Sequence, residues 1–196
     1  MFEYGAAAKT WLERGEAVKR ETDCMQGMPA AKNKLSGEQL KIFFADISRL
    51  HSMDQITFVC IGTDRSTGDA LGPLTGTGLL EAGFPHVIGT LPDPCDAISL
   101  EDKLKGIPED HLIIAIDACL GQPSSVGSFF AAKGPLNPAQ SVGRPLPAVG
   151  HYSIAAVVNV LGPKPYWTLQ VTSLHLVMTM ASRIAQAAAS GFGLSP

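Results

Sequence analysis

Two short apolar runs decide the expected fold: ITFVCI at residues 56–61 and LIIAI at residues 112–116. Both are rich in β-branched residues and apolar on both faces, as strands in the interior of a parallel sheet require. Segments with strand and helix patterns alternate around them. The chain is therefore predicted to fold as an α/β three-layer sandwich with a mostly parallel sheet, in which the two runs are neighbouring or near-neighbouring strands.

The remaining elements are expected from apolar periodicity and cap residues. Ser36 and Gln39 form a capping box at the start of a helix that reaches residue 50. The glycines of the helix expected at 70–82 weaken it but are predicted to let it approach the sheet closely; they are Gly72, Gly76 and Gly78. Further helices are expected at 99–105, 153–161 and 174–189, strands at 87–91, 128–134 and 166–172, and a Pro-rich loop at 135–150.

The composition indicates one core and one terminal extension. Of the 196 residues, 45% are apolar and only 17% are charged, which is enough apolar material for a single sizeable core. Residues 1–50 hold nearly half of the charged side chains. This change predicts a helical N-terminal arm and linker over residues 1–35, with the helix at 6–20, and a single α/β domain over residues 36–196.

Charge, hydropathy and cysteine spacing exclude several classes of protein. The net charge of −3 argues against a direct nucleic-acid binder, which usually has a basic face. No apolar run has the length of about 18 residues expected of a membrane span, and the N-terminus lacks the order of a secretory signal. The four cysteines are scattered without a C-x-x-C pair, as expected of reduced thiols in the cytoplasm. No motif predicts a bound cofactor.

Carboxylates follow the two apolar runs. Asp64 and Asp69 lie in GTDRSTGD after the first run, and Asp117 follows the second in AIDACLG. Because ligands bind beyond the carboxyl ends of the strands in open α/β sheets, these side chains are expected at one edge. Each has a structural alternative: Asp64 as a turn former, and Asp69 as the N-cap of the next helix. Asp117 needs a partner or a chemical role, because a carboxylate beside so apolar a run is costly to desolvate.

Other chemistry-bearing residues give weaker signals. His151, in PAVGHYS after the Pro-rich loop, is a candidate third polar group, as a ligand or a proton carrier; the alternative is a loop histidine without a role. Cys119 has no obvious histidine partner and is expected to be a structural thiol. The Gly-rich loop lacks the lysine of a P-loop, and no G-x-S-x-G motif indicates a nucleophile elbow.

Four segments together resemble the spore protease YyaC family of sporulating Firmicutes: FVCIGTDRSTGDALGPLTGTGL, GTLPDPCDAISLEDKL, IIAIDACLG and VGHYSIAAVVNV. The resemblance extends from about residue 56 to residue 189. That family is similar to the germination protease of spores and to the hydrogenase-maturation endopeptidases. The resemblance therefore implies a phosphorylase/hydrolase-like α/β fold.

The same resemblance implies site residues. GDALGP and AIDAC stand where the germination protease carries its two essential aspartates, which favours Asp69 and Asp117 as a catalytic pair and leaves Asp64 and His151 as accessory candidates. The hydrogenase-maturation enzymes bind nickel with two acids and a later histidine, for which His151 is the nearest candidate here. Because these three candidate ligands include no helical histidine pair, we expect no tightly bound metal.

The expected function is that of a sporulation or germination endopeptidase of the atypical aspartic type, cleaving protein or peptide substrates such as small spore proteins in the forespore or spore core. Asp69, favoured in its charged form by a helix N-terminus, is expected to be the base, and Asp117 the protonated partner. Two alternatives remain: a non-catalytic binding protein of the same fold, and a metal-binding maturation factor using Asp69, Asp117 and His151.

Overall fold

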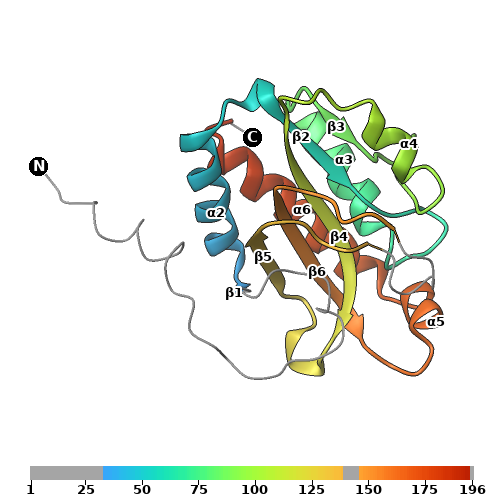
Figure 1. Ribbon diagram of the computed structural model, residues 1–196. Helices are drawn as coiled ribbons and strands as arrows, with labels where there is room; N and C mark the ends of the chain where they lie inside the picture. Colours follow the sequence, from blue (N-terminus) through green and yellow to red (C-terminus); the bar gives the residue numbers. More distant parts are fainter. Residues whose placement is uncertain (1–32, 139–145, 195–196) are drawn as a thin grey trace, which may run out of the picture.

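The computed structural model describes residues 33–138 and 146–194, which build one six-stranded sheet with helices on both faces (Figure 1). The strand order is β1-β5-β6-β4-β2-β3. The four strands β3, β2, β4 and β6 run parallel, whereas β5 is antiparallel to β6 and β1 is antiparallel to β5. The strands span Asn33–Leu35 (β1), Ile56–Cys60 (β2), Val87–Ile88 (β3), Leu112–Gly121 (β4), Phe129–Lys133 (β5) and Tyr152–Val160 (β6).

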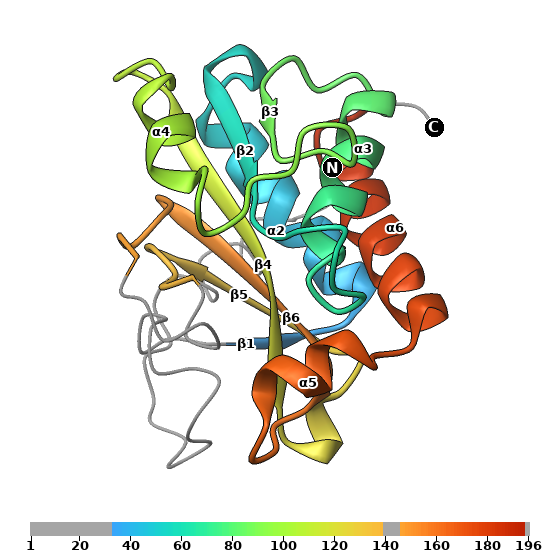
Figure 2. The same cartoon turned by 90° about the vertical axis from the view of Figure 1, so that its right-hand side faces the viewer.

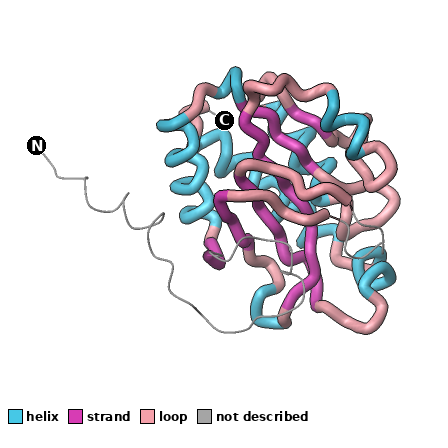
Figure 3. The backbone as a smooth tube through the Cα atoms, in the orientation of Figure 1, coloured by secondary structure: helices cyan, strands magenta, loops and turns pink. Residues whose placement is uncertain are grey.

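The helices are divided unequally between the two faces of the sheet. Three long helices, α2, α3 and α6, cover one face, and the short α4 covers part of the other (Figure 2). α5 lies beyond the end of β6 (Figure 3). The helices span Gly37–Leu50 (α2), Leu71–Glu81 (α3), Leu100–Lys105 (α4), Pro165–Gln170 (α5) and Leu174–Gly191 (α6). The predicted three-layer α/β sandwich with a mostly parallel sheet is thus confirmed.

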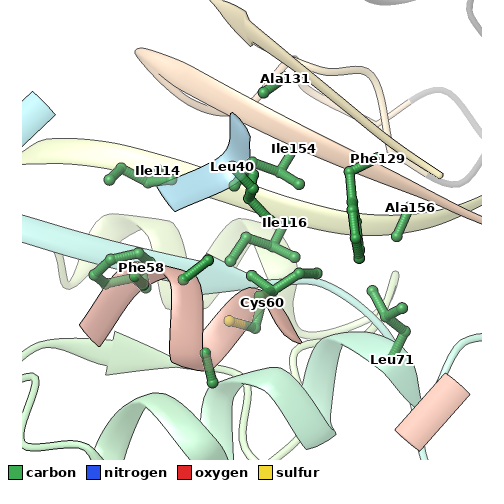
Figure 4. Close-up of a cluster of buried hydrophobic side chains, with 14 of the residues drawn as sticks. Leu40, Phe58, Cys60, Leu71, Ile114, Ile116, Phe129, Ala131, Ile154 and Ala156 are labelled. Carbon is green, nitrogen blue, oxygen red and sulfur yellow. The ribbon is translucent and has the colours of Figure 1, made fainter. Parts of the chain in front are cut away.

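The two apolar runs that predicted the fold are the adjacent strands β2 and β4. They pair in parallel from Ile56 opposite Leu112 to Cys60 opposite Ile116. Side chains of β2 alternate between two apolar clusters, one on each face of the sheet. The larger cluster fills the space under α2, α3 and α6, where Figure 4 shows Leu40, Phe58, Leu71, Ile114, Ile116 and Ile154 among its members. Burying each such side chain contributes about 1.5–3 kcal/mol, so the larger cluster contributes more to stability than the smaller one.

Two features of the helices agree with the predictions made from the sequence. The capping box at α2 forms as predicted: Ser36 N–H donates to Gln39 Oε1 at 2.8 Å, and Gln39 N–H donates to Ser36 Oγ at 3.4 Å. The close approach expected of the α3 glycines is also present. A Cβ at Gly72 would lie 2.1 Å from the Ile61 carbonyl oxygen, and a Cβ at Gly76 would lie 2.1 Å from the Gly89 carbonyl oxygen. α3 therefore packs directly on the backbone around the end of β2.

Two secondary-structure predictions are wrong. Residues 153–161, expected to be helical, form most of strand β6. Residues 166–172, expected to be a strand, contain most of helix α5. The first segment reads SIAAVVNVL, whose β-branched residues suit a strand paired on both sides, here with β4 and β5. In the second, Pro165 occupies the first turn of the helix, a position that favours helix initiation.

The N-terminal predictions fall mostly outside the described residues. The helix expected at 6–20 lies outside them, and the division of the chain at residue 35 stays a prediction. The end of the expected linker, Asn33–Leu35, forms strand β1 and pairs with β5. Within the described residues, no helix is long and apolar enough to cross a membrane.

Candidate functional site

The carboxyl end of β2 lies beside β4. Ile61 N–H donates to the Ile116 carbonyl at 2.8 Å, and β2 ends one residue earlier, at Cys60. Asp117 follows Ile116 on β4, just beyond the point where β2 turns away from the sheet. β4 itself does not end there, as the sequence had suggested, but continues to Gly121 beside β6. Asp117 therefore lies within β4, level with the end of the neighbouring strand β2.

The turn that carries Asp69 folds back on the same strand end. Thr63 N–H donates to the Asp69 carbonyl at 3.2 Å. Gly62 is packed so tightly against this carbonyl that a Cβ there would lie 2.0 Å from the Asp69 oxygen. A larger residue at position 62 would push the turn away from β2. The backbone of Asp69 is thus fixed next to Gly62, which lies two residues after the last residue of β2.

The Asp117 side chain faces the α4 side of the sheet. Side chains alternate along a strand, and Ala115, two residues earlier, belongs to the smaller apolar cluster with Cys95 and Leu100. The pKa of the Cys95 thiol is raised to about 11, chiefly by burial, and the Asp117 carboxylate is among the nearby charges that contribute to this rise. Asp117 is partly buried and lies near a thiol that stays protonated at neutral pH.

Asp69 is a partly buried carboxyl that favours its neutral form. Burial raises the pKa of Asp69, and the neighbouring Ser66 side chain lowers it by a smaller amount. The Ser66 hydroxyl is buried and makes no hydrogen bond of standard geometry among the described residues. Within the same residues, no ion pair involves Asp69. The charged form of Asp69 thus lacks compensation from a cation.

One expectation about Asp69 is therefore wrong. α3 begins at Leu71 with Ala70 at its N-cap and no side-chain cap, so Asp69 is not the capping residue. Burial raises the pKa of Asp69, which works against the charged form. Asp69 is consequently better suited to hold a proton than to act as the charged base.

An ion pair joins the Asp69 turn to the segment before α4. Arg65 Nη2 lies 2.7 Å from Asp96 Oδ2, and Arg65 Nε donates to Thr63 Oγ1 at 3.1 Å. Asp96 Oδ1 accepts hydrogen bonds from the backbone N–H groups of Ile98 and Ser99, both at 3.0 Å. The sequence analysis did not single out Arg65 or Asp96. The spacing of Asp96 and Ser99 before α4 is a capping pattern that could have identified the acid.

The two accessory candidates lie elsewhere. Asp64 is exposed in the turn before Arg65. His151 lies at the amino ends of the strands, where its N–H donates to the Ile113 carbonyl at 2.8 Å and its Nδ1 accepts from Ile113 N–H at 2.9 Å. Asp117 is four residues further along β4, or roughly 13 Å at the rise of a β-strand. The structure thus does not bring His151 to the carboxylates.

The described residues contain no group of three or more His, Cys, Asp and Glu side chains arranged to hold a metal ion. With His151 at the opposite end of the sheet, the ligand set suggested by the hydrogenase-maturation enzymes is not assembled. Cys119 lies two residues after Asp117 on β4. Its side chain is partly buried, and its thiol is not in a disulfide.

Comparison with known proteins identifies relatives of this chain. Residues 30–187 match the model of the family described as "Protein of unknown function (DUF1256)". The chain belongs to this family. It is also 44% identical over 156 residues to "Uncharacterized protein YyaC" of Bacillus subtilis (strain 168), covering 77% of this chain and 76% of that protein. The resemblance to the YyaC family is therefore confirmed. The family match over residues 30–187 includes the strands and the turn described above.

A solved structure is similar at a greater distance. It is the crystal structure of a [NiFe] hydrogenase maturation protease, HycI, from Thermococcus kodakarensis KOD1. The match covers 71% of this chain and 92% of that chain, with a TM-score of 0.49 and 19% sequence identity. No conclusion about activity follows from this likeness.

Proposed function

We propose that the chain is an endopeptidase of the atypical aspartic type, in which Asp69 and Asp117 activate one water molecule. The proposal rests on one observation: the turn of Asp69 packs on Gly62 at the end of β2, while Ile61 of the same strand end pairs with the residue before Asp117. Both carboxyl groups therefore belong to one edge of the sheet, where α/β folds bind their ligands. Two carboxyl groups of unequal environment suit general acid–base hydrolysis.

The burial of Asp69 is the basis on which we assign the roles. Asp69, whose pKa is raised by burial, holds the proton, and Asp117 acts as the charged base. In the first step Asp117 takes a proton from water, the water oxygen attacks the peptide carbonyl carbon, and Asp69 gives its proton to the carbonyl oxygen. In the second step Asp117 gives its proton to the amide nitrogen, the C–N bond breaks, and Asp69 recovers its proton from the former carbonyl oxygen. Both residues return to their starting states.

The proposed substrates are proteins, and we take small spore proteins in the cytoplasm of the forespore or spore core as the first candidates, on the basis of the resemblance to the germination protease. Neither His151 nor a metal ion is part of this proposal. Asp64 is left as a surface residue of the turn and serves as a control.

The test is digestion of a purified small DNA-binding spore protein, followed by mass spectrometry of the fragments. The wild-type chain is expected to cut it, and Asp69→Asn and Asp117→Asn are each expected to lower the rate at least about a thousandfold, as for groups that act in one catalytic unit. Asp64→Asn is the matched control and should keep the wild-type rate. Near-ultraviolet circular dichroism checks that each variant is folded. Wild-type protein that binds but does not cut would support the non-catalytic alternative.

A further inference from the structure

Strand β4 extends past the end of its neighbour β2 (Figure 1). β2 pairs with β4 only as far as Cys60, opposite Ile116, whereas β4 continues to Gly121. On its other side, β4 stays paired with β6 over this length. Beyond Ile116, no strand of the described residues occupies the β2 side of β4. An interior strand of the sheet therefore has an open edge, which begins just after Ile116.

Ala118 directs its backbone polar groups into this open edge. The N–H and C=O groups of alternate residues of a strand in a parallel sheet point to the same neighbour. Ile61 N–H donates to the Ile116 carbonyl, so the even-numbered residues of β4 point to the β2 side. Leu161 N–H donates to the Gly121 carbonyl, so the odd-numbered residues point to β6. Among the described residues, neither backbone group of Ala118 is hydrogen-bonded to the turn after β2 or to α5.

The open edge is covered on one face of the sheet and approached from the other. α5 follows β6, but its Leu169 carbonyl accepts from Gly68 N–H, in the turn after β2, at 2.9 Å. This connection crosses the level of β4, and Leu169 belongs to the larger apolar cluster, under α3 and α6. On the α4 face, Asp117 and Cys119 are partly exposed. The backbone of Ala118 is thus reached from the face that carries the Asp117 side chain.

The chemistry of Ala118 selects an extended peptide backbone as the occupant. A residue that presents an N–H and a C=O to the same side is matched by the C=O and N–H of a chain in the β conformation. A second copy of this chain fits less well. Its outer strands, β1 and β3, have only three and two residues, and a folded sheet edge would meet the connection between α5 and the turn. A single extended segment avoids this obstacle.

We infer that the N–H and C=O groups of Ala118 bind the backbone of an extended, unfolded segment of a protein substrate, which adds to β4 in line with β2. Because Ala118 directly follows Asp117, the bound segment brings a peptide bond to the proposed catalytic pair. That second part rests on the proposed function, whereas the binding itself does not. Recognition through the backbone selects for an unfolded segment and tolerates many sequences.

The experiment measures amide hydrogen exchange by NMR in the full chain carrying Asp69→Asn, so that the probe is not cut. The two probes are native ribonuclease A and the same protein reduced and capped with neutral carbamidomethyl groups. Without a probe, the Ala118 N–H is expected to exchange at least about tenfold faster than the Cys119 N–H, which points to β6. The unfolded probe should slow exchange at Ala118 about tenfold or more, and the native probe should not.

A pair of variants tests the same contact from the side of the protein. Ala118→Pro removes the N–H and fills the open edge, and proline is tolerated where a strand N–H has no ladder partner. It should bind dye-labelled unfolded ribonuclease at least about tenfold more weakly in fluorescence anisotropy. Ala118→Ser keeps the backbone groups and should bind as the wild type does. If Ala118→Pro does not fold, the exchange measurement on the native residue decides.

These measurements separate the inference from the proposed activity. Protection of Ala118 by the unfolded probe, without cleavage of the spore protein by the wild type, would keep the binding and overturn the activity. Cleavage of the spore protein by Ala118→Pro at the wild-type rate would keep the activity and overturn the inference. The inference is also overturned if the Ala118 N–H is protected in the free chain, or if the unfolded probe leaves its exchange unchanged. Protection that appears when the chain alone is concentrated would make a second copy the occupant and would overturn it as well.

Discussion

The two ends of the sheet hold their polar side chains in different ways. At the amino ends of the strands, each prominent histidine has a partner that stabilises the fold: His151 Nδ1 accepts from Ile113 N–H, and His111 Nδ1 lies 2.8 Å from Thr57 Oγ1. At the carboxyl ends, Asp69 is partly buried, its pKa is raised, and the nearby Ser66 hydroxyl is buried without a standard hydrogen bond.

This difference separates structural polar groups from candidates for chemistry. Polar groups that exist for stability are paired, because an unpaired buried group costs free energy. A partly buried carboxyl without a compensating cation destabilises the fold and is retained where it has another use. Substitutions at the amino end should therefore lower stability, whereas neutralising Asp69 should raise it.

The largest effect is expected from the packing that holds the carboxyl end together. In Gly72→Ala the new methyl group would meet the Ile61 carbonyl oxygen, so α3 must move away from β2. We expect a loss of about 3 kcal/mol in the free energy of unfolding, at the upper end for an overpacked site. Urea denaturation measures it. Gly37→Ala, at a helical glycine with no atom near the added methyl, is the matched control and should unfold no more easily than the wild type.

A smaller loss is expected at the amino end. His151→Ala removes the acceptor of the Ile113 N–H and should lower the free energy of unfolding by about 1 kcal/mol, the net value of an ordinary hydrogen bond. Cleavage of substrate should be unaffected, since His151 lies apart from the carboxylates. His175→Ala is the control, because this exposed side chain has no such bond among the described residues. If His151→Ala kept the wild-type stability but lost cleavage, His151 would have a functional role and not a structural one, which would contradict the comparison between the two ends.

The smallest effect has the opposite sign and depends on pH. The folded-state pKa of Asp69 is raised, so the folded chain binds this proton more tightly than the unfolded chain does. The resulting stability is complete below the pKa of the unfolded state and is lost as the pH rises through the folded-state pKa. Asp69→Asn should therefore melt at a higher temperature than the wild type at neutral pH, and the difference should shrink in acid. Calorimetry between about pH 4 and pH 8 measures it. A difference independent of pH would contradict the raised pKa of Asp69.

The central strands could be predicted because their signals are local. Runs that are apolar on both faces, such as residues 56–61 and 112–116, fit only a buried strand of this length. Asp117 follows such a run directly, so its place on β4 came with the strand, although β4 continues past it to Gly121. The capping box of Ser36 is equally local, because both of its hydrogen bonds lie within four residues.

The misplacement of His151 follows from one error in secondary structure. Residues 153–161 were expected to form a helix after a loop, which would have left His151 free to approach the carboxylates. They form β6 instead, parallel to β4, and the residue before a parallel strand lies at the amino end of the sheet. The pairing of β6 with β4 and β5 is a long-range choice that local propensity does not decide. The contact of Gly68 with Leu169 and the ion pair of Arg65 with Asp96 depend on the same kind of tertiary placement.

The central claim, that Asp69 and Asp117 act as one catalytic unit, is tested most directly by a double-mutant cycle on the rate of substrate cleavage. The rates of the wild type, Asp69→Asn, Asp117→Asn and the double variant are measured on the same spore protein under the same conditions. If the two carboxyl groups share one water molecule, the double variant should be no more than about tenfold slower than the slower single variant, because residues of one unit are not additive. Losses that multiply, or full activity in Asp69→Asn, would contradict the claim.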